Sequence, residues 1–379
     1  MINIIRTNCL KPGLLLAAAA VASLAGCRTA TAPDATAPGT TEGSGPAPLA
    51  QSVALTGAGA SFPAPLYQNW AIALNQKERN LQVNYQSIGS GAGIEQFTAG
   101  TVDFGASDTA MTDQQMAAVT RGTMLLPMSA GSIVFAYNLS GVETGLKLTR
   151  QTYVDIMLGK ITNWNDPAIA EANPGVTLPD QRITVVHRSD GSGTTGVLTK
   201  HLSDISDEWE SSIGQGNAVE WPGGGNFVGA RGNEGVTAQI QNVQGAFGYI
   251  EYGFASNNGL AVAALENASG NFIVPSDESA AATLAAVELP ENLRAFITDP
   301  EGEESYPIVT YTWMMMFQEN PDALKAEALE RWIEFGLNDG QEVAPSLGYV
   351  QLPTAVREKV AAAADQISPD YTITLRDLK

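Results

Sequence analysis

Residues 185–195 read VVHRSDGSGTT, a stretch in which a β-type run passes through a glycine- and serine-rich turn into the start of a helix. We expect a strand over residues 182–188 and a helix over residues 193–202. The first backbone N–H groups of a helix lack intrahelical partners, and the helix dipole places partial positive charge beside them. Ser192 is a favoured N-cap residue and adds a hydroxyl donor. The stretch therefore predicts a turn that binds an anion.

Two further turns have the same design. They are TGAGASFP at residues 56–63 and SIGSGAG at residues 87–93. Glycine lets a ligand approach the backbone closely because it has no Cβ atom. For one such turn, a well-capped helix start without a ligand is the simpler interpretation, but three turns, one of which carries Arg188, favour a shared anion. The sequence contains no Walker A loop, and GASDT at residues 105–109 lacks the last glycine of a nucleophile elbow.

Short β-type runs alternate with helical periods along the rest of the folded part. Further strands are predicted at residues 53–56, 81–88, 124–126, 133–137, 246–249 and 307–315. Between the first two of these, Leu66, Trp70 and Leu74 recur at helical spacing behind Pro63. This alternation predicts an α/β protein with largely parallel sheets covered by helices. Nothing in the sequence marks a clean break between domains, which is compatible with a chain that crosses between two domains more than once.

Length, charge and composition exclude several classes of protein. The chain has 379 residues, enough for two domains, and its charged fraction of 16% is too low for a disordered protein. Acidic residues outnumber basic ones 40 to 20, a formal net charge of −20, and no basic cluster is present, so a nucleic-acid binder is excluded. Cys9 and Cys27 are the only cysteines, and His187 and His201 the only histidines. We therefore expect no metal centre and no cofactor.

The N-terminus has the pattern of an export signal. A basic n-region precedes an apolar run at residues 14–24, which is too short to span a bilayer as a stable helix. The run ends in Leu-Ala-Gly-Cys at residues 24–27, which resembles the lipobox of bacterial lipoproteins. The resemblance implies that residues 1–26 are a signal peptide and that Cys27 becomes the lipidated first residue. An ordinary signal peptide that contains a cysteine is the alternative.

A tether follows the expected anchor. Residues 27–50 consist almost entirely of Ala, Thr, Pro, Gly and Ser and show no apolar period, so we expect a flexible, lipid-anchored linker. No later apolar stretch is long enough to cross a membrane. The sequence thus predicts an exported lipoprotein, attached to a membrane and located in the periplasm or at the cell surface.

Six blocks of sequence resemble the periplasmic phosphate-binding proteins of bacterial phosphate ABC transporters. The blocks are TGAGASFPAPLYQNW (56–70), NYQSIGSGAG (84–93), TVDFGASD (101–108), LGKITNWND (158–166), VVHRSDGSGTT (185–195) and GAFGYIEY (245–252). The resemblance implies a type II, two-domain periplasmic-binding-protein fold, with two crossing strands at the hinge and the ligand in the interdomain cleft. It places domain I at residues 51–137 and 308–379, and domain II at residues 138–307.

The resemblance also implies a set of phosphate-binding residues. They are Ser61, Phe62, Ser90, Asp108, Arg188, Ser192, Gly193 and Thr194. Ser61 stands where the family has Thr, a change that keeps the hydroxyl, and Gly91 stands where relatives can have Ser. His187 is expected to lie outside direct contact with the ligand.

Two of these residues have distinct physical roles. Arg188 offers planar, bidentate donors to two oxygens of an anion. Asp108 would repel an anion unless the ligand carries a proton to donate, which phosphate does near neutral pH and sulfate does not. The alternatives for Asp108 are a helix N-cap or an ion pair with Arg188. Because the net charge opposes an anion at long range, we expect local dipoles to provide the binding.

The resulting prediction is a monomeric receptor, not an enzyme, that binds inorganic phosphate with high affinity and delivers it to the permease subunits of an ABC transporter. Two alternatives remain open at this point. One is a phosphate-handling enzyme such as a phosphatase, in which a Ser90 or Ser192 nucleophile would need a base. The other is a surface signalling lipoprotein that keeps the fold but no longer transports. Arsenate or molybdate is a variant ligand within the main prediction.

Overall fold

The structure, a computed structural model, describes residues 48–378 of the chain. The expected signal peptide, Cys27 and most of the tether lie outside the described residues. The strands are β1 (Val53–Gly59), β2 (Leu81–Ser87), β3 (Phe104–Ser107), β4 (Met124–Tyr137), β5 (Lys147–Leu148), β6 (Thr184–Arg188), β7 (Phe227–Ala230), β8 (Ala246–Glu251), β9 (Ala261–Val262), β10 (Ala264–Glu266), β11 (Phe272–Ile273) and β12 (Val309–Met316).

The helices alternate with these strands as the sequence predicts. They are α1 (Ala64–Lys77), α2 (Ser90–Thr98), α3 (Asp113–Ala117), α4 (Arg150–Met157), α5 (Pro167–Ala172), α6 (Gly193–Ile205), α7 (Asp207–Ser212), α8 (Gly232–Asn242), α9 (Tyr252–Asn257), α10 (Asp277–Ala285), α11 (Ala323–Leu337), α12 (Asp339–Val343), the 3₁₀ helix η1 (Pro345–Leu347) and α13 (Thr354–Ala364). In the part of the chain that the structure describes, no helix combines the length and apolar character needed to cross a bilayer.

One long sheet organises the molecule. Its strand order is β2-β1-β3-β12-β4-β8-β6-β7, with β9 beside β4, and a small sheet has the order β11-β10-β5. Strand β1 is parallel to β2 and β3, and β6 is parallel to β7 and β8. In the centre, β12 is antiparallel to β3 and β4, and β4 is antiparallel to β8. The sheet is therefore mixed rather than largely parallel, because β12 runs against its neighbour β3 in one outer group and β4 runs against its neighbour β8 in the other.

Strand β4 connects the two ends of this sheet. Its residues from Met124 to Ser132 pair with β12, and its residues from Ile133 to Tyr137 pair with β8. The sequence predicted two separate strands here, interrupted around Pro127, but the structure has one continuous strand. The register shifts between Thr312 and Trp313 of β12, beside Pro127, and such an irregularity accommodates a residue that cannot donate to the ladder.

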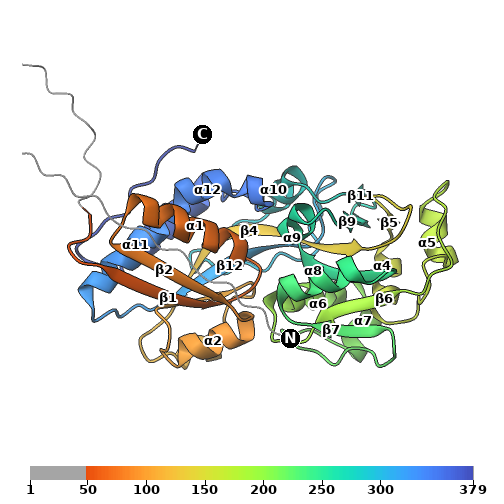
Figure 1. The fold of residues 1–379 in the computed structure, drawn as a ribbon, viewed down its shortest axis with the longest axis horizontal. Helices are drawn as coiled ribbons and strands as arrows, with labels where there is room; N and C mark the ends of the chain where they lie inside the picture. Colours follow the sequence, from red (N-terminus) through yellow and green to blue (C-terminus); the bar gives the residue numbers. More distant parts are fainter. Residues whose placement is uncertain (1–47, 379) are drawn as a thin grey trace, which may run out of the picture. The chain divides into compact units, whose positions relative to one another are not determined.

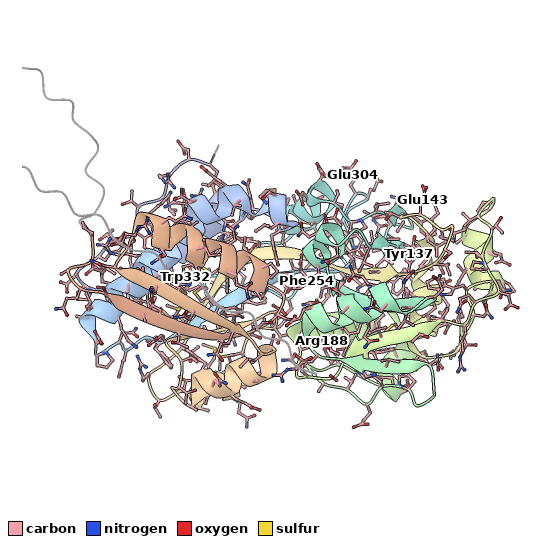
Figure 2. All side chains as sticks on the ribbon, in the orientation of Figure 1. Tyr137, Glu143, Arg188, Phe254, Glu304 and Trp332 are labelled. Carbon is pink, nitrogen blue, oxygen red and sulfur yellow. The ribbon has the colours of Figure 1, made fainter. Side chains whose placement is uncertain are left out.

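The molecule has two lobes, each with its own helices and core (Figure 1). We call the part built on β1, β2, β3 and β12 the first lobe; α1, α2 and α11 pack on its strands. The second lobe is built on β6, β7 and β8, with α8 packed against all three. Trp70 and Trp332 meet at 5.8 Å in the first core, and Phe135 and Phe247 stack at 4.7 Å in the second. Figure 2 shows Trp332 in the first lobe and Tyr137 in the second.

Candidate anion-binding site

The second and third glycine-rich turns meet between the lobes. Helix α2 begins at Ser90, and α6 begins at Gly193, the position at which the sequence predicts its start. The N–H group of Gly91 donates a hydrogen bond to the carbonyl of Gly191 at 2.9 Å. A Cβ atom on Gly193 would lie 2.6 Å from Ser90 Oγ and 2.8 Å from the Asp108 Cβ. Only glycine at position 193 therefore allows this approach.

The start of α6 has the cap that the sequence predicts. The Oγ of Ser192 accepts a hydrogen bond from the Thr195 N–H at 3.1 Å. The hydroxyl of Thr195 shares a hydrogen bond of 2.6 Å with the hydroxyl of Tyr249. The N–H groups of Gly193 and Thr194, in the first turn of the helix, have no intrahelical acceptor. The Thr194 N–H faces the Asp108 carboxyl, and both groups lie where an anion is favoured.

The first turn joins this group through a residue of the second lobe. Ser61 and Phe62 lie between β1 and α1, which begins at Ala64 after Pro63. The Oγ of Ser61 accepts hydrogen bonds from the backbone N and from Nδ2 of Asn233, both at 3.0 Å. The carbonyl of Phe62 accepts a hydrogen bond from the Tyr349 hydroxyl at 2.6 Å.

All eight residues predicted from the sequence are buried in this region. Contacts in the structure link Ser61, Ser90, Asp108 and Thr194 directly or through Asn233. Outside the group, His187 bonds through Nδ1 to the Arg188 carbonyl and stacks on Trp221 at 5.1 Å, as expected of a residue without ligand contact.

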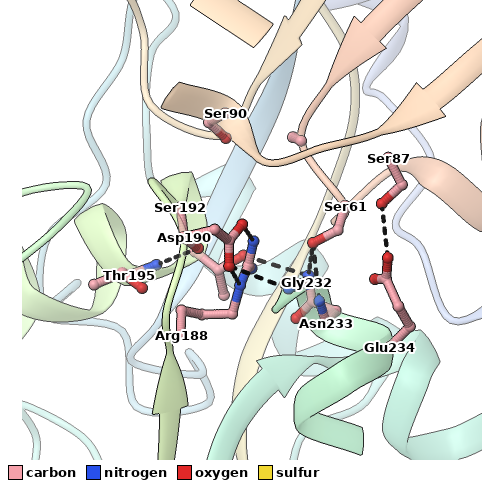
Figure 3. A network of polar contacts seen from close by, with 12 residues as sticks. Ser61, Ser87, Ser90, Arg188, Asp190, Ser192, Thr195, Gly232, Asn233 and Glu234 are labelled. Carbon is pink, nitrogen blue, oxygen red and sulfur yellow. Dashed lines mark hydrogen bonds and ion pairs between the residues drawn. The ribbon is translucent and has the colours of Figure 1, made fainter. Parts of the chain in front are cut away.

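Arg188 is the buried cation of the site. Its Nε donates to Oδ1 of Asp190 at 2.8 Å, and its Nη2 donates to Oδ2 at 2.5 Å (Figure 3). The third nitrogen, Nη1, is buried and has no hydrogen-bond partner among the described residues. A buried guanidinium group with an unused donor is the kind of group that an anion satisfies.

Asp190 is a residue of the site that the sequence analysis missed. Burial raises the pKa of its carboxyl, but hydrogen bonding to Arg188 and the charge of that residue outweigh this effect, so the pKa lies below its usual range. Asp190 also accepts a hydrogen bond from the Gly232 N–H at 3.1 Å. Asp190 stands two residues after Arg188 in the same turn, and this proximity could have indicated that the two side chains form an ion pair.

Asp108 is held by hydroxyl groups and not by Arg188. Its Oδ1 accepts from Thr312 at 2.9 Å, and its Oδ2 accepts from Thr194 at 3.3 Å. No ion pair joins it to Arg188 among the described residues, and it follows β3 without capping a helix. Both structural alternatives for Asp108, the N-cap and the ion pair, are therefore wrong.

The pKa of Asp108 is raised to about 7. Burial is the main cause, and the hydrogen bond from Thr312, the charge of Arg188 and the hydrogen bonds from Thr194 partly oppose it. A carboxyl group with this pKa accepts a proton-bearing oxygen when ionised and donates to a bare oxygen when protonated. Thr312 lies 204 positions after Asp108, and nothing in the sequence pointed to it.

The site thus combines hydrogen-bond donors from three turns, one cation with its own counterion, and one acidic acceptor. Among residues 48–378, no group of three or more metal-ligating side chains occurs. The arrangement can solvate a small oxyanion by neutral dipoles and one guanidinium group, and it places one carboxyl group where a protonated oxygen of the ligand is favoured.

Comparison with known proteins gives the family. Residues 30–339 match the model of the PBP superfamily domain. The phosphate-binding protein PstS of Pasteurella multocida is 43% identical over 317 residues, which cover 82% of this chain and 90% of the relative. PstS of Xylella fastidiosa (strain 9a5c) is 41% identical over 315 residues, covering 82% and 85% of the two chains. The chain belongs to the PstS family of phosphate-binding proteins.

Solved structures confirm the two-domain fold of this family. A phosphate-binding protein from Stenotrophomonas maltophilia is similar with a TM-score of 0.67 at 21% identity, over 82% of this chain and 94% of that one. The periplasmic phosphate-binding protein PfluDING, solved with bound phosphate, has a TM-score of 0.66 at 19% identity, over 86% and 100%. The α/β periplasmic-binding-protein fold expected from the sequence is therefore confirmed.

Proposed function

We propose that this chain binds inorganic phosphate between its two lobes and delivers it to the permease subunits of an ABC transporter. The observation that carries the proposal is the buried Arg188, whose Nε and Nη2 bind Asp190 while its Nη1 has no partner among the described residues. The names of the PstS relatives support phosphate as the anion.

The proposed ligand contacts are the eight residues predicted from the sequence. Arg188 and the N–H groups of Gly193 and Thr194 neutralise the anion, together with donors from Ser61, Phe62, Ser90 and Ser192. Asp108 accepts the proton of the ligand. Above about pH 7, where Asp108 is ionised, sulfate meets an acidic oxygen with no proton between the two, which costs on the order of 1–3 kcal/mol.

The proposed mechanism is closure of one lobe on the other around the anion. We propose domain I as residues 51–137 and 308–379, and domain II as residues 138–307. The pairing of β4 with β12 at one end and with β8 at the other supports a hinge of crossing strands. Polar contacts between the lobes, such as Thr109 Oγ1 to Asn217 Oδ1 at 3.1 Å, hold the closed arrangement.

A binding protein is favoured over an enzyme. The Oγ of Ser192 caps α6, and the Oγ of Ser90 accepts from the Asp108 N–H at 3.4 Å. Neither histidine contacts these hydroxyls, since His187 bonds to the Arg188 carbonyl and His201 to Tyr153. Neither serine hydroxyl therefore has a histidine as the base that a Ser nucleophile commonly uses. Hydrolysis of p-nitrophenyl phosphate by the purified protein would contradict this part of the proposal.

We further propose that the mature protein is an exported monomer that is anchored through lipid on Cys27, with residues 27–50 as its tether. The Leu-Ala-Gly-Cys sequence at residues 24–27 supports this. A Cys27→Ala chain should be found in the soluble fraction of cells that retain the wild-type protein in membranes. The phosphate site itself is tested by calorimetric titration, with p-nitrophenyl phosphate turnover as the separate test of an enzyme.

A further inference from the structure

Asn233 is a buried residue that contacts two of the predicted phosphate-binding residues, Ser61 and Thr194. It is the second residue of α8, it is fully buried, and it follows Gly232, whose φ of +70° turns the chain into the helix. The sequence analysis did not single it out. Its side chain has contacts on three sides: Ser61, Thr194 and the backbone of Glu251.

The contact with Ser61 decides which way the serine hydroxyl points. A serine oxygen accepts at most two hydrogen bonds and donates one. Asn233 supplies both bonds that this oxygen accepts, from its backbone N and from Nδ2, each at 3.0 Å (Figure 3). Among the described residues, nothing accepts the proton of Ser61. That proton is therefore left for an anion in the site.

The orientation of Asn233 is itself determined. Its Oδ1 accepts a hydrogen bond from the Glu251 N–H at 3.0 Å, so the amide nitrogen must face Ser61. The same Nδ2 lies 3.5 Å from Oγ1 of Thr194, whose own proton goes to Asp108 Oδ2 at 3.3 Å. Asn233 thus provides both hydrogen bonds that Ser61 Oγ can accept, and it also lies against the hydroxyl of Thr194.

The contact also joins the two lobes. Ser61 follows β1 of the first lobe, whereas Asn233 begins α8 of the second, so the two hydrogen bonds exist only when the lobes are closed. A second contact between the lobes lies one residue away: Ser87 Oγ donates to Glu234 Oε1 at 3.1 Å, in an exposed position. Neither Ser87 nor Glu234 is one of the predicted phosphate-binding residues, so this pair is a matched control for a contact between the lobes that does not touch the anion.

We propose that Asn233 is a positioning residue that directs the Ser61 proton toward the bound anion and fastens the closed lobes. The proposal rests on the proposed binding of phosphate. It also adds to specificity: because Ser61 is made a pure donor, a protonated oxygen of the ligand is disfavoured there and is directed to Asp108.

The test compares phosphate binding in six full-length variants. Four are single changes, Asn233→Ala, Glu234→Ala, Ser61→Ala and Ser61→Thr, and two combine Asn233→Ala with each Ser61 change. Asn233→Ala should raise the rate constant for phosphate dissociation about 10-fold and change the association rate constant less than about twofold. The reason is that the hydrogen bonds between Asn233 and Ser61 form after the anion enters. Glu234→Ala should change neither by more than about twofold.

The combinations separate positioning from a merely structural role. In the Ser61→Thr background, which keeps the hydroxyl, Asn233→Ala should weaken phosphate binding about 10-fold again; in the Ser61→Ala background it should weaken it less than about twofold. Thermal unfolding of each phosphate-free variant shows whether it is folded. Equal losses in both Ser61 backgrounds would overturn the proposal, as would an Asn233→Ala variant that binds like Glu234→Ala.

Asn233→Asp provides an independent measurement. The carboxylate accepts where the amide donated, so it attracts the Ser61 proton away from the anion, and it also places a negative charge beside the anion. We expect the two effects together to weaken binding at least about 100-fold relative to wild type. Binding within about threefold of wild type would overturn the proposal. If wild-type protein itself releases no heat with inorganic phosphate, the proposed phosphate binding is wrong. This result differs from a failure of the Asn233 proposal, which requires wild-type protein that binds phosphate and variants that do not lose affinity.

Discussion

Arg188 and Asp190 are joined by two hydrogen bonds, from Nε to Oδ1 at 2.8 Å and from Nη2 to Oδ2 at 2.5 Å. The guanidinium group is thereby neutralised before any ligand arrives, while Nη1 has no partner among the described residues. A buried cation is tolerated when it is paired and hydrogen-bonded. The pair therefore explains how the protein keeps a charged hydrogen-bond donor for an anion inside a buried site.

Loss of Arg188 should be the most damaging change to binding. Arg188→Ala removes the cation and leaves Asp190 as an unpaired acid beside the anion, so phosphate binding should weaken by about 2–5 kcal/mol. Ser61→Ala should cost only about 1 kcal/mol, because neighbouring N–H groups remain. Calorimetric titration of both variants measures the difference, and equal losses would mean that Arg188 is not in the site.

Asp108→Asn should reduce the preference for phosphate over sulfate. The amide keeps the size of the side chain and can donate to a bare oxygen, which the ionised carboxylate cannot. We expect the ratio of the two affinities to fall by about 10–100-fold, corresponding to about 1–3 kcal/mol. Competition titrations at pH 8, where Asp108 is ionised, check this, and an unchanged ratio would leave Asp108 with a purely structural role.

Binding of sulfate should depend on pH through Asp108. Burial raises the pKa of this carboxyl to about 7, so it is protonated below that pH and can donate to sulfate, and it is ionised and repulsive above it. Sulfate affinity should therefore fall as pH rises above 7, by up to about tenfold per pH unit. The Asp108→Asn variant lacks this titration, and a wild-type dependence of the same shape as the variant's would refute the assignment.

Much of the local structure could be predicted from sequence because its determinants are local. The cap at Ser192 and the start of α6 at Gly193 follow from a few adjacent residues. Asp108 and Arg188 were predicted as the acidic and cationic residues of the site because they stand in long, specific blocks. The resemblance also led to the correct fold.

Other features depend on residues that meet only in the folded chain. Asn233 reaches Ser61 across 172 positions, and Thr312 reaches Asp108 across 204, so no spacing rule links them. Asp190 was in view, but the choice between Asp108 and Asp190 as the partner of Arg188 depends on side-chain geometry. Strand β4 continues past Pro127 because it pairs with β12, and the strand propensity of the neighbouring residues does not predict such long-range pairing.

Glu251 should make stability depend on pH. It is fully buried at the end of β8, its Oε1 accepts from the Gly253 N–H at 2.8 Å, and its Oε2 has no partner among the described residues. Burial raises its pKa well above the usual value, and the hydrogen bond from the Gly253 N–H opposes this only in part. The folded state favours the protonated form, so its contribution is complete below the unfolded pKa of about 4.3 and is lost as pH rises through the folded pKa.

Glu251→Gln removes this titration and keeps the acceptor for Gly253. We expect the free energy of unfolding of the variant to be close to that of wild type in acid and to exceed it at alkaline pH, by roughly 1–3 kcal/mol. Urea unfolding of both phosphate-free proteins from pH 5 to pH 9 provides the comparison. A difference that stays constant across this range would show that Glu251 does not titrate in the folded protein.

The central claim is that the site selects an oxyanion that carries a proton, and one calorimetric titration tests it most directly. Full-length protein is titrated at pH 8 with inorganic phosphate and, separately, with sulfate. We expect one phosphate bound per chain and sulfate binding at least about 100-fold weaker, since the ionised Asp108 faces a ligand without a proton. Absence of phosphate binding, or equal affinity for the two anions, would contradict it.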